Sequence, residues 1–225
     1  MFHLTAGKVA AALSMVAVMV LPVFASSHAA RLLPDPKVDA PLSTAKGMRT
    51  AVFAGGCFWG VEAVFEHVKG VTEAVSGYAG GNARTAKYEV VSSGGTGHAE
   101  SVRVTYDPSR ITYGKLLKVF FSVAHNPTEL NRQGPDTGTQ YRSAIFYGDA
   151  EQKRIAESYI AQLSAAHTYP RPIVTQVTPL KAFYEAEAYH QNYLVRNPGQ
   201  PYIIFNDLPK LANLKRQFPQ LYAGK

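Results

Sequence analysis

Short apolar runs alternate with helical patterns along most of this chain, and no other feature restricts its fold as strongly. Apolar or alternating runs of strand length occupy residues 50–54, 71–78, 99–106, 140–148 and 173–180. Apolar residues at helical spacing occupy 59–68, 113–125, 149–166 and 183–194, with Thr112 as an N-cap. Helices and strands in alternation bury their apolar faces against each other, so the pattern predicts an α/β sandwich with one continuous core.

Two stretches stand outside this alternation. The loop 126–139 is long and rich in turn residues, and such loops in compact domains are often functional. After Gly199 the chain continues as a proline-punctuated tail to Lys225.

The first 29 residues have the composition of a targeting segment. Lys8 precedes the uncharged run 9–25, and small residues follow at two possible cleavage sites, Val23–Ala25 and Ser27–Ala29. A retained membrane anchor is the alternative, but Pro22 interrupts a run that is already short for a span. We therefore expect export, to the periplasm, with a signal peptide at 1–29, a proline-rich linker or loose arm at 30–48 and the functional domain at 49–225.

The charge distribution and the cysteine content argue against nucleic-acid binding and against an internal disulfide. The formal net charge is +7 and falls to +6 when residues 1–29 are removed with Lys8, and the remaining positive charges are scattered among acids. This gives no support to nucleic-acid binding. Cys57 is the only cysteine, so no disulfide can form within the chain. A lone thiol in an exported protein calls for chemistry or for an outside partner.

Cys57 lies where a strand pattern ends and a helical pattern begins. Gly55 and Gly56 allow a sharp turn, after which the unpaired N–H groups of the helix start favour an anion. We therefore expect a lowered thiol pKa and a nucleophilic Cys57. Phe58 and Trp59 occupy adjacent helical positions and cannot both face the core, so at least one stands beside the thiol. The alternative is a buried core thiol at an ordinary strand-helix junction.

Other polar clusters carry weaker signals when taken singly. His98 and Glu100 in TGHAE stand at a strand entry, but a metal site would need a further ligand at suitable spacing. Taken singly, such residues more often have a purely structural role: the acid is solvated, the tyrosine packs in the core and the histidine caps a helix. The remaining candidates are Tyr88 before a glycine-rich turn, Asp136 and Tyr141 at the end of the long loop, and His190 and Tyr193 on a predicted helix.

Taken together, GGCFWGVE, TGHAE, GTQYRS and YHQNYL resemble the peptide methionine sulfoxide reductases of the A type, over about residues 49–197. The resemblance implies an α+β fold, a two-layer sandwich around a mixed sheet with a ferredoxin-like core. It implies reduction of the S epimer of methionine sulfoxide, free or in proteins, without metal or cofactor, and thus repair of oxidised proteins. We expect a monomer.

The resemblance also implies a role for each matching residue. Cys57 would attack the sulfoxide sulfur, Glu100 would protonate its oxygen, and Tyr88 and Tyr141 would hydrogen-bond that oxygen. The substrate-binding set would comprise an apolar wall for the S-methyl group, Phe58 and Trp59, and residues that position water and the tyrosines, Asp136, His190 and Tyr193.

The chemistry agrees with these roles, because a sulfoxide becomes a good electrophile only when its oxygen is protonated. A glutamic acid near aromatic walls is desolvated, which raises its pKa and keeps the proton in place. Attack would leave Cys57 as sulfenic acid.

One departure from the family concerns recycling. Many members carry further cysteines near the C-terminus, whereas residues 199–225 have none. A thioredoxin-like protein, a glutaredoxin or a small thiol would therefore have to reduce the sulfenic acid.

Two other functions remain open on the sequence alone. A cysteine hydrolase or acyltransferase would pair Cys57 with His98 or His190 and with Asp136, and it needs a histidine within hydrogen-bond reach of the sulfur. A non-catalytic peptide-binding module would use the exposed aromatics and would keep its function in Cys57→Ser.

Overall fold

The computed structural model describes Met1, His3 and residues 33–224, so the predicted signal peptide lies almost entirely outside the described residues. The strands are β1 (Arg49–Gly55), β2 (Val71–Ala79), β3 (Ala99–Tyr106), β4 (Arg132–Gln133), β5 (Asp136–Thr137), β6 (Ser143–Tyr147), β7 (Gln176–Pro179) and β8 (Phe183–Glu185). The helices are α1 (Phe58–Glu66), α2 (Tyr88–Val91), α3 (Tyr113–Val119), α4 (Ala150–Ala165), α5 (Tyr193–Arg196) and α6 (Leu208–Gln217). Short 3₁₀ or π turns lie at η1 (Ala83–Thr85), η2 (Phe120–Ala124), η3 (Thr139–Tyr141) and η4 (Ile203–Asp207).

The main sheet has six strands in the order β7-β6-β1-β3-β2-β8. Only β6 and β7 pair in parallel, and the other neighbours are antiparallel. β3 lies between β1 and β2, so the unit β1-α1-β2 is a split βαβ, the ferredoxin-like arrangement. The predicted mixed sheet with a ferredoxin-like core is confirmed.

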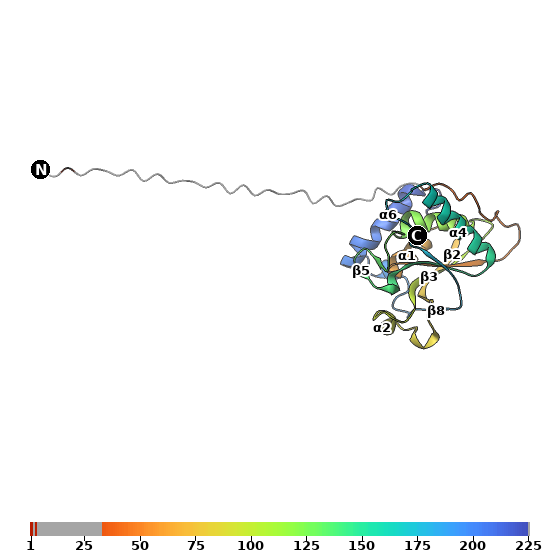
Figure 1. Cartoon of the computed structure of the whole chain (residues 1–225), viewed down its shortest axis with the longest axis horizontal. Coiled ribbons are helices and arrows are strands. Elements are labelled where there is room, and N and C mark those ends of the chain that lie inside the picture. The colour runs from red at the N-terminus through yellow and green to blue at the C-terminus, as the bar shows by residue number, and fades with distance from the viewer. Residues whose placement is uncertain (2, 4–32, 225) are drawn as a thin grey trace.

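Alternation along β1 separates the two faces of this sheet. Ala51 and Phe53 join the large core that also contains the buried residues of α1, α3 and α4. Val52 and Ala54 join a small cluster on the opposite face. Helices α1, α3 and α4 therefore pack on one face of the sheet. In Figure 1, α4 and α6 lie at the top, and α2 lies at the bottom beside β8.

The predicted N-cap of α3 is present, and α4 is capped in the same way. Thr112 accepts the backbone N–H of Lys115 at 3.2 Å at the start of α3. Asp149 does the same for Gln152 at 2.7 Å at the start of α4. Such caps satisfy N–H groups that the helix leaves unpaired.

The helix predicted over 183–194 is wrong. Residues Phe183–Glu185 form β8 against β2, and only the single turn α5 is helical. Gly77 explains the strand, because a methyl group there would lie 2.3 Å from the ring of Phe183, so the missing side chain makes room for that ring. Pairing with the free edge of β2 thus overrides the local helical pattern.

The proline-punctuated tail contains helix α6, which the sequence did not predict. Pro209 stands in its first turn, where proline is tolerated. Leu214 is fully buried against the core that includes α1. The tail is therefore part of the folded domain.

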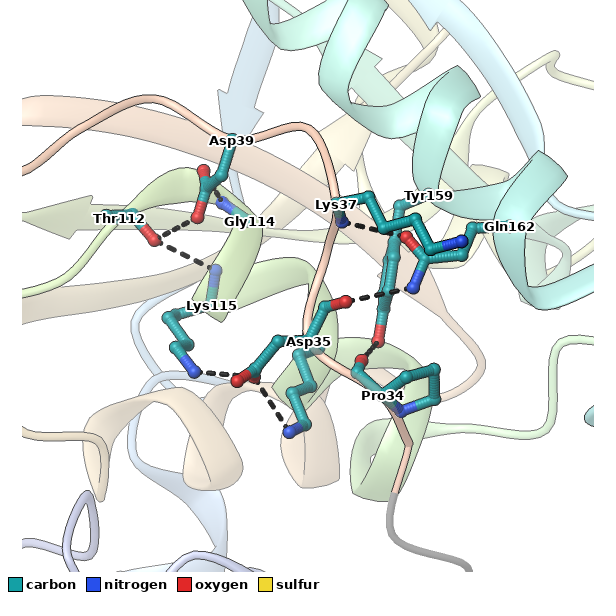
Figure 2. A network of polar contacts seen from close by, with 10 residues as sticks. Pro34, Asp35, Lys37, Asp39, Thr112, Gly114, Lys115, Tyr159 and Gln162 are labelled. Atoms are coloured by element: carbon teal, nitrogen blue, oxygen red, sulfur yellow. Dashed lines mark hydrogen bonds and ion pairs between the residues drawn. The ribbon is translucent and has the colours of Figure 1, made fainter.

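Part of the expected loose arm is also bound to the domain (Figure 2). Asp35 pairs with Lys115 and Lys118 of α3 at 2.5 and 2.9 Å. The hydroxyl of Tyr159 in α4 donates to the carbonyl of Pro34 at 2.8 Å. We call residues 33–40 the strap, because they cross α3 and α4 without helix or strand. Among the described residues no helix is long and apolar enough to cross a membrane.

Candidate active site

Two glycines at the end of β1 bring the chain tightly into α1. A methyl group at Gly55 would lie 3.0 Å from His125, and one at Gly56 would lie 2.5 Å from Gln133. Gly56 also has φ of +88°, a conformation that favours glycine. The turn they make leaves Cys57 as the N-cap residue of α1.

Cys57 lines a pocket of about 170 Å³ that distant segments build together. Its walls come from α1, α2, β3, β5, η3 and the start of the tail helices. The lining residues are Cys57, Phe58, Trp59, Tyr88, Glu100, Asp136, Tyr141 and Tyr202. All four predicted catalytic residues thus meet in one pocket, together with three of the five predicted substrate-binding residues.

Glu100 reaches the pocket from β3 and is only 2% exposed. Its Oε2 accepts the backbone N–H of Phe58 at 3.1 Å, which ties the carboxyl to the first turn of α1. Burial raises its pKa to about 8, and the nearby Asp136 adds to that rise, although the Phe58 N–H opposes it. Glu100 therefore carries a proton at neutral pH, as the sequence argument expected.

Tyr88 and Tyr141 remain neutral hydrogen-bond donors. Burial raises the pKa of Tyr88 to about 12 and also raises the pKa of Tyr141. The backbone N–H of Tyr88 donates to Glu187 at 3.0 Å, which fixes the start of α2. Gln140 donates to the carbonyl of Ser92 at 3.0 Å and ties the end of α2 to η3. The two tyrosines are thereby held on adjoining elements.

The expected lowering of the Cys57 pKa is wrong. Burial raises the pKa of the thiol well above its usual range, and the carboxyls of Glu100 and Asp207 raise it further. The backbone N–H of Trp59 and the charge of Lys210 lower it, but by less. The helix start favours a thiolate, as argued from the sequence, yet desolvation is the larger effect.

Phe58 and Trp59 differ in burial, as expected for adjacent positions on a helix. Phe58 is buried against Tyr78, with ring centroids 5.9 Å apart, whereas Trp59 is only partly buried. Trp59 stacks on Tyr193 at 3.7 Å and donates its indole N–H to His190 at 3.1 Å. His190 and Tyr193 therefore lie behind the wall and orient Trp59, rather than lining the pocket.

Tyr202 is a pocket residue that the sequence argument missed. Its hydroxyl donates to the carboxylate of Asp136, and its ring meets Trp59 edge-on at 6.0 Å. With 13 tyrosines in the chain, one in a proline-punctuated tail gave no usable signal. Through Tyr202 and its hydrogen bond to Asp136, the tail forms one side of the pocket.

A buried ion pair beneath α1 was also missed. Lys210 contacts Asp207 at 3.0 Å, and Asp207 is fully buried. A methyl group at Gly60 would lie 2.1 Å from Asp207 and 2.6 Å from Lys210, so the pair packs directly on the first turn of α1. Both charges act on Cys57, in opposite directions.

The hydrolase alternative lacks its base. Within residues 33–224 no histidine hydrogen-bonds Cys57 or lines its pocket. Both ring nitrogens of His98 are engaged, with the N–H of Gly81 and the carbonyl of Asn82. The Nδ1 of His190 accepts from Trp59. Without a general base at the sulfur, acyl transfer has no support here.

A family model described as peptide methionine sulfoxide reductase matches residues 49–221. The chain belongs to this family. Among its relatives, the peptide methionine sulfoxide reductase MsrA 2 of Mesorhizobium japonicum is 64% identical over 181 residues, which cover 80% of this chain and 93% of the relative. MsrA 2 of Synechocystis sp. is 52% identical over 197 residues, covering 87% of this chain and 92% of the relative.

Solved structures of the family share the fold. Mxr1 of Saccharomyces cerevisiae in reduced form is 35% identical with a TM-score of 0.61, covering 73% of this chain and 92% of Mxr1. Methionine sulfoxide reductase A of Corynebacterium diphtheriae is 38% identical with a TM-score of 0.59, covering 74% of this chain and 84% of that protein. The predicted membership of the peptide methionine sulfoxide reductase family is confirmed. The roles of the individual residues stay predictions.

Proposed function

We propose that this enzyme reduces the S epimer of methionine sulfoxide, free or in proteins, with Cys57 as nucleophile and Glu100 as acid. Reduction of methionine sulfoxide is the activity of the family. The single observation that supports these roles is a buried thiol and a protonated carboxyl lining one small aromatic pocket.

The pocket residues have complementary tasks in such a reduction. Phe58 and Trp59 offer an apolar wall to the S-methyl group, because aromatic faces bind alkyl groups well and exclude water. Tyr88 and Tyr141 are neutral donors for the sulfoxide oxygen. Glu100 is the acid, since its pKa of about 8 keeps a proton available at neutral pH.

The chemical step transfers oxygen from one sulfur to another. The Sγ of Cys57 bonds to the substrate's oxidised sulfur as Glu100 gives its proton to the sulfoxide oxygen. The oxygen then passes to Cys57 as both the sulfur-oxygen bond of the substrate and the new sulfur-sulfur bond break, leaving methionine and a sulfenic acid. The proton that the thiol loses returns Glu100 to its acid form, so the step consumes no net proton.

The proton on Glu100 also favours nucleophilic attack. When ionised, this carboxyl opposes formation of a thiolate at Cys57. At neutral pH it is protonated, so that repulsion is absent while the Trp59 N–H and Lys210 still stabilise negative charge on sulfur. Acid and nucleophile are therefore coupled.

Recycling requires thiols from outside the chain, because Cys57 is its only cysteine. One thiol displaces water from the sulfenic acid to give a mixed disulfide, and a second thiol releases Cys57 and forms a disulfide with the first. A thioredoxin-like protein, a glutaredoxin or a small thiol supplies both reducing equivalents.

Export is a separate part of this proposal and rests on residues 1–29. Periplasmic fractionation and the mass of the mature N-terminus test it, with a cleaved chain in the periplasm expected. Light scattering of the purified protein tests the expected monomer.

The experiment that tests the function is turnover of each resolved epimer of N-acetyl-methionine sulfoxide with dithiothreitol as electron donor. We expect N-acetyl-methionine from the S epimer alone. Cys57→Ser should abolish it, whereas a binding module would be unaffected. Reduction of both epimers at similar rates, or activity of a tenth or more in Cys57→Ser, would contradict the proposal.

A further inference from the structure

The pocket residue Tyr88 lies on an element that cannot hold itself in place. Helix α2 is a single turn of four residues, and its N-cap residue Lys87 makes no side-chain capping bond. Helices this short are unstable on their own in water, so other parts of the fold must fix them. The end of α2 is fixed, because Val91 is buried in the core and the carbonyl of Ser92 accepts a hydrogen bond from Gln140. The start of the helix, which carries Tyr88, needs a separate anchor.

Glu187 is that anchor, and it connects Tyr88 to the core of the sheet. One carboxylate oxygen accepts the backbone N–H of Tyr88 at 3.0 Å, and the other accepts the hydroxyl of Tyr78 at 2.9 Å. Tyr78 is fully buried in β2, where it stands opposite Glu100 of β3, and its ring packs on Phe58. The carboxylate therefore bridges the helix of Tyr88 and the strand pair that carries the proposed acid.

Glu187 is ionised at neutral pH, which strengthens both of these hydrogen bonds. Burial acts to raise the pKa of Glu187, but hydrogen bonds from the N–H of Tyr88, from its own N–H and from the Tyr78 hydroxyl outweigh it, so the pKa lies below its ordinary value. Hydrogen bonds to an ionised carboxylate are stronger than those to a neutral acceptor. The same segment supports the Tyr88 ring, because the ring of His190 lies 4.4 Å from it and the backbone N–H of His190 donates to the carbonyl of Glu187 at 2.9 Å.

We propose that Glu187 is a positioning residue for the reaction: its carboxylate holds the Tyr88 hydroxyl at the pocket beside Glu100, so that both groups reach the same sulfoxide oxygen. The inference rests on the proposed function, because the place of Tyr88 matters to the rate only if its hydroxyl donates to that oxygen. Glu187 is not among the residues that line the pocket. Its effect on the rate must therefore pass through Tyr88, which distinguishes it from a residue that only stabilises the fold.

The test is a double-mutant cycle on the single-turnover rate for the S epimer of N-acetyl-methionine sulfoxide, without reductant. Loss of one donor to a developing charge costs about 10²–10³-fold, so a displaced Tyr88 hydroxyl should cost about tenfold. Glu187→Ala should therefore slow the wild type by about tenfold but slow the Tyr88→Phe variant by less than about twofold. Glu187→Gln should keep most of the rate, because its amide oxygen can accept the Tyr88 N–H and its amide N–H can face the Tyr78 oxygen.

Two further variants separate positioning from folding. Glu89→Ala is the matched control, because Glu89 is an exposed acid on the same helix, and it should leave the rate unchanged. Tyr78→Phe removes one bond of the bridge but keeps the buried ring, so it should slow the reaction severalfold, again only when the Tyr88 hydroxyl is present. Urea unfolding checks that each variant is folded in the assay. If Glu187→Ala does not fold, the same cycle with Tyr78→Phe decides the inference.

Equal slowing by Glu187→Ala in the wild type and in the Tyr88→Phe variant would overturn the inference, as would a wild-type rate in Glu187→Ala. Failure of the wild type to reduce any sulfoxide would contradict the proposed function instead. In that event a crystal structure of Glu187→Ala still decides the inference. It should show the Tyr88 hydroxyl displaced from the pocket, and an unmoved hydroxyl would overturn the role of Glu187.

Discussion

Replacing Glu100 with glutamine should stabilise the fold while removing the activity. The pKa of Glu100 lies at about 8 in the folded protein, against 4.5 for a free side chain. Because the folded pKa is raised, the stability contributed by protonated Glu100 is fully present below pH 4.5 and is lost progressively up to pH 8. Glutamine does not titrate, and its amide oxygen can still accept the Phe58 N–H.

The size of the stability difference follows from the difference between the assay pH and the pKa of Glu100 in the unfolded chain. Each pH unit between 4.5 and 8 costs the wild type about 1.4 kcal/mol relative to the variant. Glu100→Gln should therefore be roughly 3 kcal/mol more stable at pH 7 and nearly equal at pH 4. Its single-turnover rate should fall by about 10²–10⁴-fold, because it cannot deliver a proton.

Urea unfolding of both proteins at each pH from 4 to 8 measures the stability difference, since groups common to both proteins cancel. A difference that stays constant across this range would refute the raised pKa. Wild-type single-turnover rates in Glu100→Gln would refute its role as the acid.

Three further predictions concern the surroundings of the pocket. Asp207→Asn should lower the pKa of Cys57 and Lys210→Met should raise it, as measured from the pH dependence of alkylation by iodoacetamide; shifts of the same sign would contradict the electrostatic account. Methyl sulfoxides should be reduced about 10–200-fold faster than propyl sulfoxides if aromatic rings enclose the alkyl group, and equal rates would remove those rings from the pocket. Leu33→Ala should lower the free energy of unfolding by about 2 kcal/mol, because this side chain of the strap is buried. Leu42→Ala should change the free energy of unfolding by less than about 0.5 kcal/mol, because Leu42 is exposed. Equal losses in the two variants would show that the strap is not packed.

Local chemistry made the centre of the site predictable from sequence. Gly55 and Gly56 lie between a strand pattern and a helical pattern, and they place Cys57 at the start of α1. Capping of α3 by Thr112 is equally local. Such features depend on neighbours in the chain, so the residues themselves reveal them.

The errors arose where distant segments decide the outcome. The stretch after Lys181 has helical spacing, yet the unpaired edge of β2 and the space at Gly77 make it a strand. Tyr202 enters the pocket only because α6 folds the tail back onto α1. The pKa of Cys57 is raised by burial, which a sequence motif at a helix start does not reveal.

The stoichiometry of the reaction without reductant tests the single-thiol cycle most directly. Because Cys57 is the only cysteine, each protein should release one methionine and stop as the sulfenic acid. Rapid quench should then show a burst of one methionine per protein, a sulfenate-specific reagent should label Cys57, and an added monothiol should restore turnover through a mixed disulfide. A burst of two methionines per protein before any thiol is added would contradict the account.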